Sequence, residues 1–176
     1  GSATVNVSLQ GTKQPYDLQK DLAPITQITV QPYSLVVNPK LPVKNLAELI
    51  AFAKANPDML NYGSSGHGGI SHLAGELLCS MAKVKMTHVP YKGTAQSLVD
   101  LRSGNIQVII ENLPAVLPLI QGKELKALGM GASKRSSFLP DLPTIAESGV
   151  PNYESSSWSG LFAPAATPAA VLEKLQ

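Results

Sequence analysis

Short apolar runs alternate, through the middle of the chain, with stretches whose apolar residues recur every three or four positions. Such runs are typical of buried strands, and the longer spacing is typical of helices that pack on a sheet. The expected strands are residues 59–63, 85–89, 106–110 and 125–130, and the expected helices are residues 45–55, 71–82 and 94–103, with a short one reaching Gln121. This order predicts an α/β protein with a doubly wound, mostly parallel sheet.

The two ends of the chain follow other patterns. Residues 25–38 form a long extended run, but Pro32 has no N–H group to donate, so we do not expect one continuous central strand there. In the first expected helix, Asn45 is a candidate cap with Glu48 three residues on. Beyond residue 130 prolines recur, and we expect a capped short helix over 144–147 ending at Gly149, a strand over 153–163 and a last helix opening at Thr167-Pro168.

Glycine and serine are concentrated where the 59–63 strand meets its helix. Residues 63–69 read Gly-Ser-Ser-Gly-His-Gly-Gly. Small residues clear the approach to the start of a helix, where the first backbone N–H groups have no partner inside the helix. These N–H groups and the positive end of the helix dipole attract anions. Ser65 to Ile70 therefore predict a site for a carboxylate or phosphate group, which is held without reacting.

Four loops follow the expected strands and should gather at one edge of the sheet, because ligands of doubly wound sheets bind beyond the carboxyl ends of the strands. They are Ser64–Ile70, Pro90–Thr94, Glu111–Pro114 and Gly131–Arg135. Two are rich in glycine and hydroxyl groups, and one carries a carboxylate and an amide. Gly and Ser could simply make turns here, but four converging loops favour a polar binding site.

Composition and charge exclude several classes of function. The chain has 176 residues, of which 44% are hydrophobic and 15% charged, so one folded domain with a sizeable core is expected. The net charge is only +2 and the basic residues are scattered, which argues against nucleic-acid binding. We find neither a membrane-spanning apolar stretch nor a signal peptide. Cys79 lies among apolar residues, which favours a buried small side chain over a reactive thiol.

Enzymatic and metal-binding motifs are missing from the sequence. We find no Gly-x-Ser-x-Gly elbow, no phosphate loop and no complete dinucleotide fingerprint. The histidines do not have the spacing of metal ligands, since His67 and His72 would lie about 140° apart on a helix, and His88 is expected to be structural. A catalytic triad of Ser65, His72 and Asp100 is conceivable, but no pattern in the sequence indicates that these three residues lie together. We therefore expect no catalytic residues, no metal and no cofactor; activity against generic esters would reveal the enzyme alternative.

Several segments together resemble one family. They are Asn61–Gly69, Ser71–Leu77, His88–Gly93, Glu111–Pro114, Ser133–Arg135, Leu139–Thr144 and Ser156–Pro164. In this order and spacing the chain resembles the solute-binding proteins of tripartite tricarboxylate transporters, also called the Bordetella uptake gene family. Each segment is weak alone, but the set covers nearly the whole chain.

The resemblance implies a two-lobed periplasmic protein with a type II binding-protein fold, which closes on a dicarboxylate, tricarboxylate, acidic amino acid or aromatic acid. The protein would deliver this ligand to a membrane permease of two components. A solute sensor that presents its ligand to a membrane kinase is the alternative. The candidate ligand-binding residues are Ser65, Gly66, His67, Gly68, Gly69, Ile70, His72, Tyr91, Lys92, Gly93, Glu111, Asn112 and Trp158.

The chain departs from the family pattern in three respects. Gly69 stands where Ser or Thr is common, and Glu111 stands where Asp is common, so we expect the longer acid to reach deeper into the cleft. Family members are also longer, with a first-lobe Pro-Gly-Gly loop and a C-terminal helical tail that this chain lacks. We therefore expect residues 32–129 to form the second lobe, with 1–31 and 130–176 as crossover strands and first-lobe remnants. With half of the cleft missing, the chain alone should bind its solute poorly. Its unpaired strand edges should also favour self-association or strand exchange.

Overall fold

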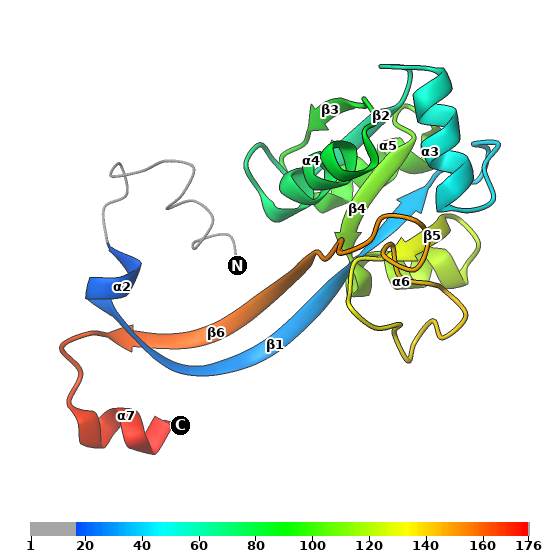
Figure 1. The fold of residues 1–176 in the computed structure, drawn as a ribbon. Coiled ribbons are helices and arrows are strands. Elements are labelled where there is room, and N and C mark those ends of the chain that lie inside the picture. Colours follow the sequence, from blue (N-terminus) through cyan, green and yellow to red (C-terminus); the bar gives the residue numbers. More distant parts are fainter. Residues whose placement is uncertain (1–16, 176) are drawn as a thin grey trace. The chain divides into compact units, whose positions relative to one another are not determined.

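The computed structural model describes residues 17–175, which divide into two compact units (Figure 1). Pro32–Ser156 form an α/β unit, and the residues before and after it form a smaller unit. Residues 1–16, including Gly1-Ser2 and the start of the expected first-lobe remnant, lie outside the described range.

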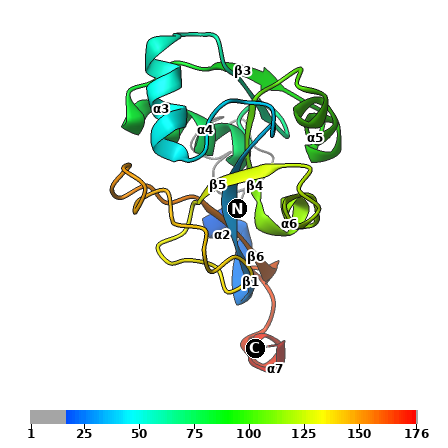
Figure 2. The same ribbon diagram turned by 90° about the vertical axis from the view of Figure 1, so that its right-hand side faces the viewer.

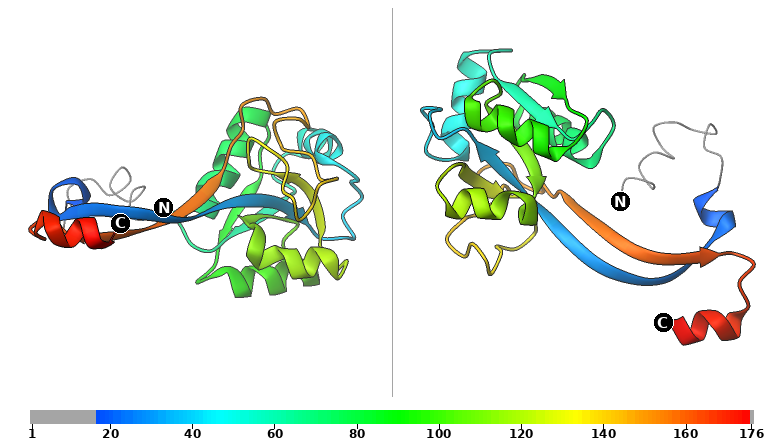
Figure 3. Two further views of the ribbon diagram at one scale, coloured as in Figure 1. Left: turned by 90° about the horizontal axis from the view of Figure 1, so that it is seen from below. Right: turned by 180° about the vertical axis from the view of Figure 1, so that it is seen from behind.

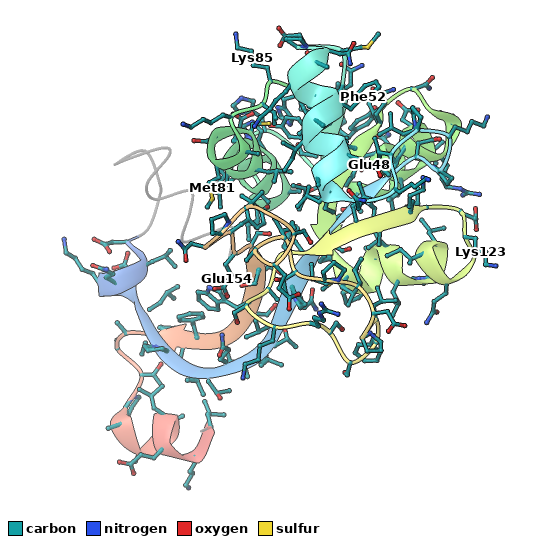
Figure 4. All side chains as sticks on the ribbon, turned by 45° about the vertical axis from the view of Figure 1, so that its right-hand side comes forward. Glu48, Phe52, Met81, Lys85, Lys123 and Glu154 are labelled. Atoms are coloured by element: carbon teal, nitrogen blue, oxygen red, sulfur yellow. The ribbon has the colours of Figure 1, made fainter. Side chains whose placement is uncertain are left out.

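The α/β unit has the predicted alternation of strands and helices, with boundaries that shift by a few residues. Its elements after the first strand are α3 (Leu46–Ala55), β2 (Asn61–Ser64), α4 (Ile70–Ala82), β3 (Thr87–Pro90), α5 (Thr94–Ser103), β4 (Val108–Asn112), α6 (Leu113–Gln121) and β5 (Lys126–Met130). The predicted cap of α3 is confirmed, because Asn45 Oδ1 accepts a hydrogen bond from the Glu48 amide at 2.9 Å. Figure 4 labels Glu48 and, further along the same helix, Phe52.

The sheet runs in the order β3-β2-β4-β1-β5, where β1 spans Leu22–Val37. β2 pairs in parallel with both β3 and β4, whereas β1 is antiparallel to β4 and β5. β2, β3, β4 and β5 therefore share one direction, as the predicted mostly parallel α/β sheet requires. Their carboxyl ends lie at one edge of the sheet.

Helices cover both faces of this sheet (Figure 2). Alternate residues of β1 point to opposite faces, so Leu35 and Val37 join the core beneath α3 and α4, whereas Val36 joins the core beneath α5 and α6. β4 does the same with Ile110 and Ile109. A central strand that is buried on both faces explains why its sequence is almost wholly apolar.

The prediction that Pro32 would break the extended run was wrong, since β1 continues through it as one strand. Pro32 is the first residue of the α/β unit, and the pairing of β1 with β4 and β5 begins only at Tyr33 and Ser34. The missing N–H group therefore falls outside the central ladder, where proline costs little.

The short helix expected at 144–147 is a single turn in the structure. Its capping box forms as predicted: the Thr144 amide donates to Glu147 Oε2 at 2.7 Å and the Glu147 amide donates to Thr144 Oγ1 at 3.0 Å. The chain leaves this turn at once through Gly149, which has a φ of 108°. A cap without enough following residues does not propagate a helix.

The smaller unit contains α2 (Leu18–Asp21), the first half of β1, most of β6 (Ser156–Pro164) and α7 (Ala169–Leu175). β6 pairs with β1, and the two strands run side by side in Figure 3. Large apolar side chains on these two paired strands are exposed, including Ile28 at 57% and Val30 at 59%. The expected last strand and last helix are both present here.

Residues 130–156 pack with the α/β unit within this chain. The Ser155 amide donates to the Gly131 carbonyl, and the Tyr153 hydroxyl donates to the Ala74 carbonyl at 2.9 Å. The lobe boundary expected at residue 129 stays a prediction for a longer protein.

The contact between α4 and β2 gives the first testable prediction. A Cβ at Gly75 would overlap the fully buried ring of Tyr62, whose nearest atoms include Cδ2 at 2.7 Å and Cζ at 2.9 Å. We expect Gly75→Ala to lower the free energy of unfolding in urea by about 1–3 kcal/mol through overpacking, despite the better helix propensity of Ala. Ser80→Ala, at an exposed position of the same helix, is the matched control; equal stability of the two variants would contradict this packing.

Candidate functional site

Three strand ends meet at one edge of the α/β unit, because β2 lies in parallel between β3 and β4. Ser64 ends β2 opposite Pro90, which ends β3. The Tyr91 amide donates to the Ser64 carbonyl at 3.0 Å, so this pairing continues one residue past the strand. The loops that the sequence predicts to converge after β2, β3 and β4 therefore do so.

Internal hydrogen bonds hold the glycine-rich turn after β2. Gly66 and Gly68 have φ values of 147° and 75°, conformations that L side chains rarely adopt. Ser71 Oγ, which is fully buried, accepts from the Ser65 amide at 3.0 Å and bonds Ser65 Oγ at 2.9 Å. Ser64 Oγ donates to the Gly66 carbonyl at 3.0 Å. These contacts fix where the turn delivers the chain into α4.

Helix α4 begins without a side-chain cap. Its N-cap is Gly69, which has no side chain that could accept a hydrogen bond. The amides of Ile70, Ser71 and His72 form no hydrogen bond with any other residue within 17–175. Three outward N–H groups at the positive end of a 13-residue helix form the anion-binding arrangement that the sequence predicts.

The three histidines cluster beside this turn. Ring centroids are 3.9 Å apart for His72 and His88 and 4.7 Å apart for His67 and His72. The expected separation of His67 from His72 was wrong because His67 is not helical: α4 starts only at Ile70, and the preceding turn brings the His67 ring beside that of His72. Even so, no three or more His, Cys, Asp or Glu side chains among the described residues are placed so that they could hold a metal ion.

Each of the two inner imidazoles has a defined partner. His72 Nδ1 accepts from the Gly68 amide at 3.1 Å, and His88 Nε2 lies 2.7 Å from Ser64 Oγ. Burial lowers the pKa of His88 to about 4, helped by His72 and His67 and opposed by Glu76. Burial, then His67, also lowers the pKa of His72, again against Glu76. Both rings are therefore neutral at neutral pH.

Glu111 at the end of β4 turns back into the unit. The residue is only 2% exposed, and its carboxylate is paired: Oε2 accepts from Thr94 Oγ1 and Oε1 accepts from the Asn112 amide, both at 2.8 Å. The carboxylate is thus held by α5 and by the end of its own strand, and its expected reach deeper into the cleft stays a prediction. Asn112 Oδ1 caps α6 by accepting from the Ala115 amide at 3.2 Å.

The loop after β3 brings Tyr91, Lys92 and Gly93 to this edge of the sheet. The Tyr91 hydroxyl donates to Asp100 Oδ2 at 2.7 Å, and burial followed by this bond raises the pKa of Tyr91 to about 12. Lys92 is exposed, and Gly93 is the N-cap of α5, again without a side-chain cap. Of these candidates, Tyr91 is engaged inside the unit, whereas Lys92 is free of any ion pair among residues 17–175.

Trp158 belongs to the smaller unit, where its ring lies 6.2 Å from that of Phe162. Its proposed role in ligand binding stays a prediction. In the loop after β5, Arg135 pairs with Glu147 at 3.0 Å rather than standing free.

A hollow of about 400 Å³ adjoins the start of α4. It is lined by Ile70, Leu73, Ala74, Leu77, Glu154, Ser155 and Ser156. A larger hollow of about 610 Å³ lies by Asn38 after β1, Arg102 in the last turn of α5 and Glu124 before β5, at the opposite edge of the sheet. Ligands of α/β sheets bind at the carboxyl ends of parallel strands, so the smaller hollow, beside α4, is the candidate for a ligand.

The profile of the tripartite tricarboxylate transporter family receptors matches residues 2–176. The chain belongs to this family. It is 38% identical over 153 residues to Protein BugT of Bordetella pertussis, which covers 87% of this chain and 47% of that protein. It is 36% identical over 162 residues to a UPF0065 protein from the tcbD-tcbE intergenic region of Pseudomonas sp. strain P51, covering 92% of this chain and 48% of the relative.

Solved structures agree with this membership. The R. palustris protein Rpa4515 with adipate has 41% identity and a TM-score of 0.86, over 93% of this chain and 55% of that one. MatC from Rhodopseudomonas palustris with bound malate has 32% identity and a TM-score of 0.84, over 97% of this chain and 58% of that one. The predicted family and fold class are thus confirmed, and the chain spans about half the length of the relatives it matches.

This family consists of solute-binding receptors rather than enzymes, and the site agrees. Ser65 bonds Ser71, whereas Asp100 accepts from Tyr91 and from Asn105, so the conceivable triad is not assembled. Cys79 is half-buried, and burial raises the pKa of its thiol to about 11, which opposes a reactive thiolate. No helix within residues 17–175 is both long enough and apolar enough to cross a membrane.

Ser71 and His88 also belong to the hydrogen-bonded cluster at this edge, although they were not among the residues predicted for the site. Ser71 occupies the inward face of α4 with Ala74, Gly75 and Leu78, and a serine at a buried helical position is a signal that could have been used. His88 could be found only from strand register, because it lies opposite Tyr62 in the β2–β3 pair.

The histidine cluster predicts acid destabilisation. The pKa of His88 is lowered from 6.5 to about 4 in the folded chain, so the unfolded chain binds more protons between these values. The free energy of unfolding should therefore fall as the pH is lowered through this window. We expect His88→Gln, which keeps a polar group near Ser64, to show a shallower fall in urea unfolding measured across the window. Parallel curves for the two proteins would contradict this, since all carboxylates are common to both.

The buried carboxylate of Glu111 gives a second prediction about the stability of the fold. We expect Thr94→Val to destabilise the chain by about 1–3 kcal/mol, because Oε2 of the buried carboxylate loses its donor. Thr94→Ser keeps the hydroxyl group and serves as the control in urea unfolding. A valine variant as stable as the serine variant would show that the contact contributes nothing.

Proposed function

We propose that this protein captures a small carboxylated metabolite in the periplasm and delivers it to a two-component membrane permease. The ligand classes are dicarboxylates, tricarboxylates, acidic amino acids and aromatic acids. The observation that carries the proposal is the uncapped start of α4, where the amides of Ile70, Ser71 and His72 have no partner within 17–175. A carboxylate placed there would accept charge-assisted hydrogen bonds.

The relatives support the chemistry and the compartment. Rpa4515 was solved with adipate and MatC with malate, and both ligands are dicarboxylates. BugD, 32% identical with a TM-score of 0.79 over 88% of this chain and 52% of that one, is described as a periplasmic binding protein. The permease follows from the tripartite transporters that give the family its name.

Thermal unfolding of the chain against a panel of acids tests the proposal, at acid concentrations high enough to detect the weak binding expected of the chain alone. The panel contains adipate, malate, citrate, glutamate and benzoate, with adipamide as the uncharged analogue of adipate. A ligand that binds only the folded chain stabilises it by about 2.7 kcal/mol at a hundredfold excess over its dissociation constant. We expect one acid class to raise the midpoint while adipamide does not. A panel without any shift, or an equal shift with adipamide, would contradict carboxylate capture.

Proline substitution at Ile70 removes one of the outward amides without disturbing the helix. Ile70 is the first residue of α4, a position that accepts proline, and Gly69 before it is extended with φ −73° and ψ 167°. We expect Ile70→Pro to bind the acid about tenfold or more weakly than Ile70→Ala, because one charge-assisted hydrogen bond is lost. Calorimetric titration of both variants measures the difference.

The alanine variant controls for loss of the half-buried isoleucine side chain, and urea unfolding shows whether the proline variant is folded. Equal affinities of two folded variants would mean that the amide of residue 70 does not contact the ligand.

A further inference from the structure

One side chain ties the glycine-rich turn to the helix that comes after it. His72 Nδ1, in the first turn of α4, accepts a hydrogen bond from the Gly68 amide at 3.1 Å. Gly68 has a φ of 75° and lies two residues before Ile70, where the outward amides begin. The bond therefore fixes the last part of the turn just before the helix.

This hydrogen bond depends on the protonation state of the imidazole. An N–H donor can be received at Nδ1 only while that nitrogen carries no proton, so the proton of neutral His72 is on Nε2. Nε2 faces the carboxylate of Glu76, with Oε1 at 3.9 Å. A second proton on the ring would place two N–H groups against each other at Gly68, and the contact would have to open.

The surroundings of His72 keep its ring neutral. Its own helix contributes Glu76, β2 contributes Tyr62, the turn contributes His67 and β3 contributes His88. Tyr62 donates its hydroxyl proton to Glu76, so part of that carboxylate is already engaged. Burial, with His67 next, lowers the pKa of His72 against the attraction of Glu76.

We propose that His72 is a positioning residue whose unprotonated Nδ1 holds the turn in the conformation that presents the helix amides, so that carboxylate capture weakens on acidification. This inference rests on the proposed function. His72 acts here through its side chain and Gly68, separately from its own backbone amide.

A bound carboxylate would also attract a positive charge on the imidazole, which would favour tighter binding in acid. That attraction crosses an exposed turn, where it is screened by water and salt. Loss of the Gly68 contact acts directly on the backbone that presents the amides. The sign of the pH dependence therefore separates the two effects.

Two variants make the test specific. His72→Asn places a carbonyl oxygen near the position of Nδ1, so it accepts from Gly68 but does not titrate. His72→Leu removes the acceptor at every pH. The affinity of each protein for the acid found in the panel is measured by calorimetry between about pH 7.5 and 4.5, a range that extends well below the ordinary histidine pKa because the pKa of His72 is lowered.

We expect the affinity of the parent protein to fall on acidification, by up to about tenfold per pH unit below the pKa of His72. The asparagine variant should keep its affinity over this range, and the leucine variant should bind weakly throughout. Because protonation of the ligand itself affects all three proteins alike, only the difference between them counts. A parent profile as flat as that of the asparagine variant, or one that rises in acid, would overturn the proposal.

A second readout needs no ligand. Hydrogen exchange of the Gly68 amide, followed by NMR, should lose protection on acidification relative to neighbouring helix amides in the parent protein but not in the asparagine variant. Unchanged protection in the parent protein would overturn the role of Nδ1 even if an acid binds. If no acid binds, this loss of protection would still support the proton-dependent contact, and the carboxylate function alone would fail.

Discussion

The parallel pairing of β2 between β3 and β4 determines where every polar group of the α/β unit lies. This pairing brings the ends of three strands to one edge, and each strand is followed there by a helix. Parallel strands require such crossovers, so helix starts accumulate at the same edge. The starts of α4 and α5 differ from that of α6, because Asn112 caps α6 whereas Gly69 and Gly93 provide no side-chain cap. The topology and the missing caps leave helix amides available to an anion, and the hollow of about 400 Å³ adjoins those of α4.

Most polar groups at this edge are satisfied inside the unit. Glu111 is held by Thr94 and by Asn112, and Ser71 is held by Ser65. Such internal pairing is expected for buried polar groups, and it orders the loops before any ligand arrives. The helix amides remain unpaired within the described residues, which gives the edge its capacity to bind. The histidine cluster adds a condition, since the turn keeps its shape only while His72 accepts a hydrogen bond from Gly68.

Local sequence patterns predicted most of this arrangement. Asn45 and the glycine-rich turn were recognised because caps and turns depend on a few adjacent residues. Pro32 and the 144–147 turn were misjudged because their outcome depends on strand partners and on the residues beyond the cap. The clustering of His67, His72 and His88 could not be predicted from spacing, since it depends on where α4 begins and on the register of β3 against β2. The position of Glu111 likewise depends on a residue distant in sequence, because its carboxylate accepts a hydrogen bond from Thr94 of α5.

An NMR titration of the chain with malate or adipate, following backbone amides, tests the central claim most directly. The account predicts that the amides of Ile70, Ser71 and His72 shift first and saturate together, since an anion that accepts their hydrogen bonds changes their environment most. Shifts that instead concentrate around Asn38, Arg102 and Glu124, at the opposite edge of the sheet, would contradict it.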